Sequence, residues 1–249
     1  MSAAHRDSGA IVVTGANRGI GAGIALELAR RGYCVAALTR TGQIAAEHEP
    51  YAGQVCGFAC DVTDTAALSA ALAAAAGRFG QLRGLVNNAG LHLYGHSKEF
   101  SDTDFDRVMR VNAHAPFAAC RQAFPYLEQR PGALIVNIGS FFDRLGVKNN
   151  VAYCASKAAL GAITRCLAVE WASAGIRVIN VAPGYVATDL NREALSAGPL
   201  AAYLRGRIPS GAPGSAEDVA RLIGALYCED LPFLTGETIY IDGGQSIAH

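Results

Sequence analysis

The chain has 249 residues, of which 51% are hydrophobic and 17% are charged, and its formal net charge is zero. This composition suits one large α/β domain or two small ones, and it argues against nucleic acid or an anionic membrane as the main partner. No signal-peptide core precedes the first strand and no apolar run reaches the roughly 18 residues of a membrane span, so we expect a cytoplasmic protein.

Short apolar runs alternate with helical patterns along the chain. The expected strands are 10–14, 33–38, 55–59, 82–87, 133–138, 177–182 and 238–241. The expected helices are 24–31, 64–77, 104–127, 153–172 and 215–227. This alternation predicts a single α/β domain over residues 1–249, a Rossmann-type doubly wound parallel sheet of about seven strands with helices on both faces. The Gly- and Pro-marked segment 184–213 carries no strand pattern and is expected to be a substrate lid.

The seven cysteines are scattered, and the closest pair, Cys56 and Cys60, lacks the further Cys or His residues of a metal site. We expect free thiols in a reducing compartment and no bound metal.

A glycine-rich turn, Gly15-Ala16-Asn17-Arg18-Gly19-Ile20-Gly21, follows the first strand. Such a turn lets backbone N–H groups approach a pyrophosphate at the start of the next helix. Its GxxxGxG spacing differs from the GxGxxG dinucleotide fingerprint. A dinucleotide site is therefore expected, and a tight corner without a ligand is the alternative.

The end of the second strand bears on the choice of cofactor. NAD-binding proteins usually carry an acidic residue there, but this strand ends in Leu38-Thr39-Arg40. Arg40 and Arg18 suit a 2′-phosphate because guanidinium groups bind phosphate in a bidentate way. NADP(H) is therefore predicted over NAD(H), unless both arginines are solvated surface charges. Asp61, after the third strand, is expected to read the adenine amino group.

Tyr153 and Lys157 are four residues apart on one predicted helix and therefore share a face. A nearby cation lowers the pKa of a phenol, and a phenol tuned this way exchanges a proton with an alcohol or ketone oxygen. Alone, this pair fits equally a buried Tyr and an exposed Lys on an ordinary helix.

Over nearly its full length the chain resembles the classical short-chain dehydrogenases/reductases. The motifs that carry the resemblance, in chain order, are Thr14-Gly15-xxx-Gly19-Ile20-Gly21, Asn87-Asn88-Ala89-Gly90, Asn112, Ser140, Tyr153-xxx-Lys157, Pro183-Gly184 and Thr188. The resemblance implies that Tyr153 is the general acid/base, that Ser140 holds the substrate oxygen and that Lys157 holds the nicotinamide ribose. It also implies that Asn112 keeps a water in a proton relay.

The resemblance further implies the cofactor contacts. Besides the glycine turn, Thr39, Arg40 and Asp61, these are Val62, Asn88, Ala89, Gly90, Tyr153, Lys157, Pro183, Gly184, Val186 and Thr188. Pro116 supports the role of Asn112, because proline has no N–H and would leave the Asn112 carbonyl free for a water. A plain proline kink is the alternative.

The residues that flank these motifs are expected to line the substrate pocket, together with Ser140: His92, Tyr94, Phe141, Phe142 and Tyr185. Their aromatic content favours a largely apolar carbonyl substrate. His92 is either a second acid/base or a polar wall residue, and Arg144 and Lys148 either meet an anionic group or lie on the surface.

These observations predict an NADP(H)-dependent carbonyl reductase or alcohol dehydrogenase. A 3-oxoacyl-acyl-carrier-protein reductase is the alternative within the class, and a non-catalytic NADP-binding sensor is the alternative outside it. The Tyr153 helix is more apolar than one buried face requires, which predicts a homo-oligomer, and the family resemblance implies that it is a homotetramer.

Overall fold

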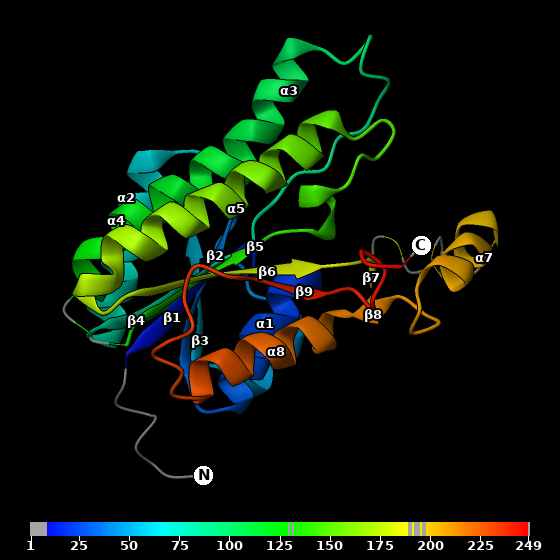
Figure 1. Cartoon of the computed structure of the whole chain (residues 1–249). Helices are drawn as coiled ribbons and strands as arrows, with labels where there is room; N and C mark the ends of the chain where they lie inside the picture. The colour runs from blue at the N-terminus through cyan, green and yellow to red at the C-terminus, as the bar shows by residue number, and fades with distance from the viewer. Residues whose placement is uncertain are drawn as a thin grey trace.

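The computed structural model describes residues 9–128, 130, 132–188, 191, 195 and 198–248 (Figure 1). Seven parallel strands form one sheet in the order β3-β2-β1-β4-β5-β6-β9. They are β1 (Ala10–Thr14), β2 (Cys34–Thr39), β3 (Val55–Ala59), β4 (Leu82–Asn87), β5 (Leu134–Ile138), β6 (Arg177–Pro183) and β9 (Thr238–Ile241). All seven predicted strands are therefore confirmed within a residue or two.

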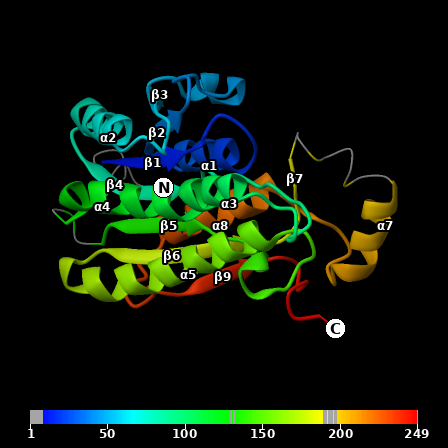
Figure 2. The ribbon, with the colours of Figure 1, turned by 90° about the horizontal axis from the view of Figure 1, so that it is seen from above.

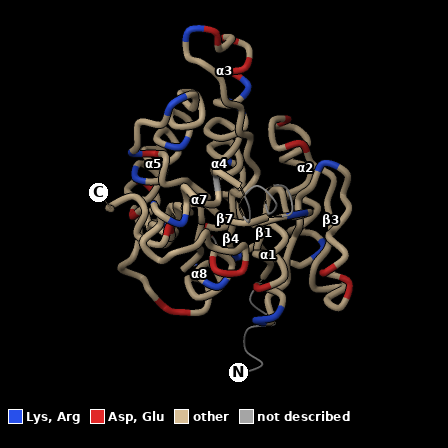
Figure 3. The backbone as a smooth tube through the Cα atoms, turned by 90° about the vertical axis from the view of Figure 1, so that its right-hand side faces the viewer, with Lys and Arg blue, Asp and Glu red and all other residues tan. Residues whose placement is uncertain are grey.

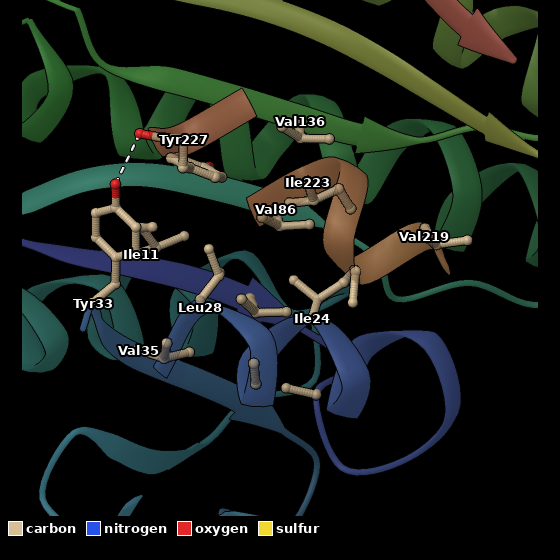
Figure 4. Close-up of a cluster of buried hydrophobic side chains, with 14 of the residues drawn as sticks. Ile11, Ile24, Leu28, Tyr33, Val35, Val86, Val136, Val219, Ile223 and Tyr227 are labelled. Atoms are coloured by element: carbon tan, nitrogen blue, oxygen red, sulfur yellow. Dashed lines mark hydrogen bonds between the residues drawn. The ribbon is translucent and has the colours of Figure 1, made fainter. Parts of the chain in front are cut away.

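Helices cover both faces of the sheet (Figures 1 and 2). One face carries α1 (Gly19–Arg30) and α8 (Ala216–Cys228), and the other carries α2 (Thr65–Phe79), α4 (Ala115–Leu127) and α5 (Val151–Trp171). Figure 4 shows the first of these layers, in which Ile24 and Leu28 of α1 face Ile223 of α8 over the strands. Burying each such side chain contributes about 2 kcal/mol, so the sheet is a rigid base for its loops. The predicted fold class is confirmed.

The predicted helix 104–127 is in fact three segments. These are α3 (Asp102–Met109), a π-helical turn η3 (Arg110–His114) and α4. The N–H of Ala115 donates to the carbonyl of Arg110, five residues earlier. Pro116 follows at once and has no N–H to offer, so the local hydrogen-bond pattern widens there instead of continuing as α-helix. Ser101 caps α3, because its hydroxyl accepts from the N–H of Asp104.

The segment 184–213 contains structure that the sequence pattern did not predict. Two-residue strands β7 (Val186–Ala187) and β8 (Gly214–Ser215) pair in parallel, too short to give an alternating pattern. Helix α7 (Gly198–Arg207) lies away from the sheet (Figures 1 and 2), and its Leu204 packs with Leu195 and Ile208 in a small cluster. Residues 189–190, 192–194 and 196–197 of the expected lid lie outside the described residues.

Short 3₁₀ turns complete the fold. They are η2 (Ala46–Tyr51), η4 (Phe141–Arg144) and η5 (Ala172–Ala174). No helix in the described part of the chain is long and apolar enough to cross a bilayer.

Three buried asparagines form a row across the middle of the sheet. Asn87, Asn137 and Asn180 are register partners in β4, β5 and β6. The Asn87 amide donates to Asn137 Oδ1 at 2.9 Å, and the Asn137 amide donates to the hydroxyl of Thr164 in α5 at 2.9 Å. The row therefore helps to fix the position of α5 along β5, the strand that ends two residues before Ser140.

Candidate active site

A pocket of about 640 Å³ opens at the carboxyl ends of the strands. It lies where β1 and β4 are neighbours although the chain runs from β1 to β2, the place where ligands bind on doubly wound sheets. Its walls come from segments that follow β1, β2, β3 and β4. The residues predicted to bind a cofactor that line it are Gly15, Asn17, Arg18, Gly19, Ile20, Gly21, Thr39, Arg40, Asp61, Val62, Asn88, Ala89, Gly90 and Thr188.

The glycine turn requires glycine at two positions. Gly15 has a φ of +65°, a backbone conformation that residues other than glycine rarely adopt. A Cβ on Gly21 would lie 2.3 Å from the carbonyl oxygen of Gly15, so the turn closes only without one. Arg18 precedes α1 without a side-chain cap, and the first turn of α1 has no acidic residue. The first N–H groups of α1 therefore remain available to an anion, which fits a pyrophosphate.

Asn88 joins the ends of β1 and β4 beneath this turn. Its side-chain amide donates to the carbonyls of Thr14 and Gly15, at 2.9 and 3.2 Å. The Thr14 hydroxyl in turn accepts from the N–H groups of Asn88 and Ala89, each at 3.0 Å. These bonds hold the floor of the pocket.

Cationic side chains contribute to the lining of the pocket. Arg18 and Arg40 both line it, as predicted, and Asp61 faces the same space. Hydrogen bonds from the Thr63 hydroxyl and N–H lower the pKa of Asp61, and the charge of Arg40 adds to them. Asp61 is therefore an ionised acceptor that a base amino group can satisfy.

Sequence reasoning missed Arg107 and Arg110, which line the pocket from α3 and η3. Their spacing of three residues places them on one helical face, but nothing in the sequence indicates that this face meets the glycine turn.

Asn112, Ser140, Tyr153 and Lys157 meet beside this pocket. A Cβ on Gly90 would lie 3.5 Å from Asn112 Oδ1 and 3.9 Å from Lys157 Nζ, so Gly90 separates the pocket from this group. Lys157 is only 5% exposed, and its ammonium donates to the carbonyl of Ile138 at 2.7 Å. The structure thus brings together all four residues predicted to be catalytic.

The pKa of Tyr153 differs from the sequence expectation. Burial raises it to about 12, while a hydrogen bond with the Ser140 hydroxyl acts in the lowering direction. The Lys157 ammonium lies 5.6 Å from the centre of the Tyr153 ring, on a backbone carbonyl. Lys157 is therefore not among the causes of this shift, and desolvation of the phenol sets its direction, so the lowering expected from Lys157 is not present in this structure. Burial also lowers the pKa of Lys157, to about 8.

Asn112 is fully buried, and both its side-chain nitrogen and its side-chain oxygen are engaged in hydrogen bonds within the protein. Its amide donates to the Leu91 carbonyl at 2.8 Å and to the Ser156 hydroxyl at 3.0 Å, and its Oδ1 accepts from the N–H of Leu91 at 2.8 Å. Asn112 therefore ties the segment after β4 to α5. Binding of a relay water by its carbonyl stays a prediction.

Aromatic rings surround Tyr153 as expected. Phe142 lies 6.0 Å from it between ring centres, Phe141 lies 4.7 Å from Phe142, and Tyr185 lies 5.5 Å from Phe141. His92 lies closer to Tyr153, at 4.5 Å. Tyr94 is 76% exposed and stands outside this ring cluster, 6.4 Å from His92.

The remaining predicted residues lie at the edges of the site. Thr188 lines the pocket opposite Gly19, where an added Cβ would lie 3.4 Å from Thr188 Cγ2, whereas Pro183, Gly184 and Val186 precede it without lining the pocket. Arg144 stacks on Tyr240 at 3.7 Å and donates to the hydroxyl of Ser246, so it is engaged within the chain. Lys148 is exposed.

Replacing Lys157 by Met is expected to stabilise the cofactor-free fold by about 1–3 kcal/mol at pH 7. A folded-state pKa of about 8 instead of 10.5 means that the ammonium is disfavoured by burial. Burial of the Lys157 ammonium therefore lowers the free energy of unfolding, and this effect is fully present below pH 8. Between pH 8 and pH 10.5 the folded protein has already lost the proton that the unfolded chain still holds, so the effect disappears as the pH rises through this range. Urea unfolding at pH 7 and pH 10 measures the change.

The control for this substitution is Met at the exposed Lys148, which should leave stability unchanged at both pH values. Equal destabilisation of the Lys157→Met variant at pH 7 and pH 10 would show that the Ile138 hydrogen bond outweighs the desolvation of the ammonium.

Comparison with known proteins shows the family to which the chain belongs. Residues 15–246 match a family model described as enoyl-(acyl carrier protein) reductase. The chain is 34% identical to D-threitol dehydrogenase of Mycolicibacterium smegmatis, over 97% of this chain and 94% of that one. It is 33% identical to the 3-oxoacyl-acyl-carrier-protein reductase of Escherichia coli, over 94% and 96%. A solved structure of a putative gluconate dehydrogenase from Agrobacterium tumefaciens superimposes with a TM-score of 0.89 at 28% identity, over 98% and 99%. The chain belongs to the short-chain dehydrogenase/reductase family and is an oxidoreductase of alcohol and carbonyl groups that uses a nicotinamide cofactor.

Proposed function

We propose that this protein is an NADP(H)-dependent carbonyl reductase or alcohol dehydrogenase in which Tyr153 exchanges the proton. The observation that carries the proposal is the meeting of Ser140, Tyr153 and Lys157 beside a glycine-walled pocket that also holds Arg18 and Arg40. Proton transfer and dinucleotide binding are thereby adjacent.

A nicotinamide cofactor, when bound, would supply the hydride to the carbonyl carbon or accept it from the alcohol carbon. The Ser140 hydroxyl donates a hydrogen bond to the substrate carbonyl oxygen and holds it next to Tyr153. As charge develops on that oxygen, the Tyr153 hydroxyl transfers its proton to it and the carbonyl becomes an alcohol. We propose that Lys157 stabilises the phenolate that remains on Tyr153 when its ammonium turns from the Ile138 carbonyl towards that oxygen.

The preference for NADP(H) is supported by the charges that line the pocket. Four arginines, Arg18, Arg40, Arg107 and Arg110, contribute to its walls, and Asp61 is the one carboxylate among the lining residues described. A 2′-phosphate adds negative charge to the cofactor, which this set of cations favours. Thr39 and Arg40 stand where a carboxylate would bind a 2′-hydroxyl.

The two alternatives have less support. A carrier-protein reductase needs a basic surface for an acidic partner, but the net charge is zero and Figure 3 shows Lys and Arg interspersed with Asp and Glu. A relative of that name does match the chain, so acyl thioesters belong in the test. A non-catalytic sensor has no use for a buried Lys157 beside Tyr153.

The test is a panel of ketones, diketones, keto-sugars and acyl thioesters, each with NADPH and with NADH, followed at the nicotinamide absorbance. We expect turnover of ketones with a higher kcat/KM for NADPH. Turnover confined to acyl thioesters would favour the carrier-protein reductase, and cofactor binding without any turnover would favour the sensor.

We also propose a homotetramer, supported by an apolar stripe on α5. Ala158, Ala162 and Cys166 are exposed at four-residue spacing, and Val169 beyond them is 80% exposed. Such a helix face is typical of subunit contacts. Light scattering should give about four times the 25.9 kDa chain mass at micromolar concentration.

Replacing Ala162 by Glu should lower this mass, because a charge would be buried in the contact. Replacing Ala74 by Glu on the exposed face of α2 is the matched control and should leave the mass unchanged. A monomeric mass for the unmodified chain would contradict the proposal.

A further inference from the structure

His92 is the polar ring that faces Tyr153. Its ring centre lies 4.5 Å from that of Tyr153 at an interplanar angle of 43°, while Phe142 meets Tyr153 edge-on at 6.0 Å. His92 is itself exposed. A substrate that reaches the Tyr153 hydroxyl therefore has an imidazole beside it within an otherwise aromatic wall.

Asn150 determines which nitrogen of His92 carries the proton. The Asn150 amide donates to the carbonyl of Lys148 at 2.7 Å, which leaves its Oδ1 facing His92 Nε2. An amide oxygen can only accept, so Nε2 is the N–H of the neutral ring. Nδ1 is then an acceptor, and it has no hydrogen-bond partner among the described residues.

The side chain of Asn150 does not cap the helix that it precedes. Asn150 stands at the N-cap of α5, where an asparagine side chain usually accepts from the helix and contributes about 1 kcal/mol, yet it makes no such bond. Next to it, Asn149 has a left-handed φ of 64°, and its carbonyl accepts from the N–H of Gly95 at 2.9 Å. The turn before α5 is thus joined to the His92 segment at two points, which holds the ring in place.

We infer that His92, oriented by Asn150, accepts a hydrogen bond at Nδ1 from a hydroxyl on the carbon next to the reacting carbonyl. The inference rests on the proposed function. Ser140 and Tyr153 both present donors, which suit a carbonyl oxygen, whereas His92 presents an acceptor, which suits a hydroxyl and has no counterpart in a simple ketone. The preferred substrates are therefore α-hydroxyketones and, in the reverse direction, vicinal diols. Asn150 is a positioning residue.

The experiment compares each ketone reduced in the panel with its α-hydroxy counterpart, beginning with 2-butanone and 3-hydroxy-2-butanone. The quantity measured is the ratio of the two kcat/KM values. One good hydrogen bond corresponds to roughly a tenfold preference for the hydroxyketone. His92→Phe should remove this preference by lowering kcat/KM for the hydroxyketone alone. Asn150→Ala should lower the ratio in the same direction.

Two further variants separate recognition from loss of structure. His92→Asn keeps an oxygen acceptor near the position of Nδ1 and should retain part of the preference. His96→Phe makes the same change at another exposed histidine and should leave the ratio as it is in the unmodified protein. A ratio near one in the unmodified protein, or an unchanged ratio in His92→Phe, would overturn this inference while the proposed function stands. An absence of turnover with every ketone would instead reject the proposed function.

Discussion

Replacing Tyr153 by Phe is expected to lower kcat by about 10²–10⁴-fold while NADPH binding stays nearly unchanged. The substitution removes one oxygen and keeps the ring that packs against His92 and Phe142. Because burial raises the pKa of Tyr153 to about 12, the phenol is protonated at neutral pH and is ready to donate in the direction of carbonyl reduction. The loss should therefore appear in the chemical step and not in cofactor affinity.

Steady-state kinetics and a fluorescence titration with NADPH measure the two quantities separately. Tyr126→Phe is the matched control, because it removes the same oxygen from a ring on α4 that does not line the pocket. Unchanged turnover in Tyr153→Phe would overturn the assignment of the proton donor, and a parallel loss of NADPH binding would point to a structural effect.

Replacing Arg40 by Asp is expected to lower the ratio of kcat/KM for NADPH over NADH by about 10²–10³-fold. Loss of the guanidinium removes charge-assisted hydrogen bonds to a 2′-phosphate, each contributing about 1.5–3 kcal/mol. The new carboxylate repels that phosphate and accepts from the 2′-hydroxyl of NADH. Both changes move the ratio in the same direction.

The measurement needs both cofactors at a fixed ketone concentration. Arg78→Asp, an exposed change of the same charge on α2, is the control for long-range electrostatics and should leave the ratio unaltered. If the ratio in Arg40→Asp equals that of the unmodified protein, the 2′-phosphate site is not at Arg40. Arg107 and Arg110 would then be the next residues to change.

The sequence was sufficient to predict the sheet and which candidate site residues lie together, because both depend on strong local signals. Buried β-branched runs define strands, and the glycine turn, Asn88, Ser140 and Thr188 all follow strand ends, which a parallel sheet brings to one edge. The spacing of Tyr153 and Lys157 fixed their common face.

What the sequence did not reveal depends on contacts between distant segments. Strands β7 and β8 have two residues each and exist only because they pair with one another. Arg107 and Arg110 reach the pocket only through the orientation of α3 and η3. The raised pKa of Tyr153 follows from the burial of the phenol, which depends on the tertiary structure and cannot be predicted from the spacing of Tyr153 and Lys157.

The asparagine row also has a consequence for assembly of the sheet. Parallel strands made of Val, Ile and Leu can slide past one another with little loss of apolar contact. Here, a slip of β5 by one residue would separate Asn137 from Asn87 and Asn180 and leave their amides facing hydrocarbon, at roughly 1–3 kcal/mol for each orphaned group. The misaligned sheet is thereby disfavoured, and the native register also determines the distance between the end of β5 and the α5 side chains opposite it.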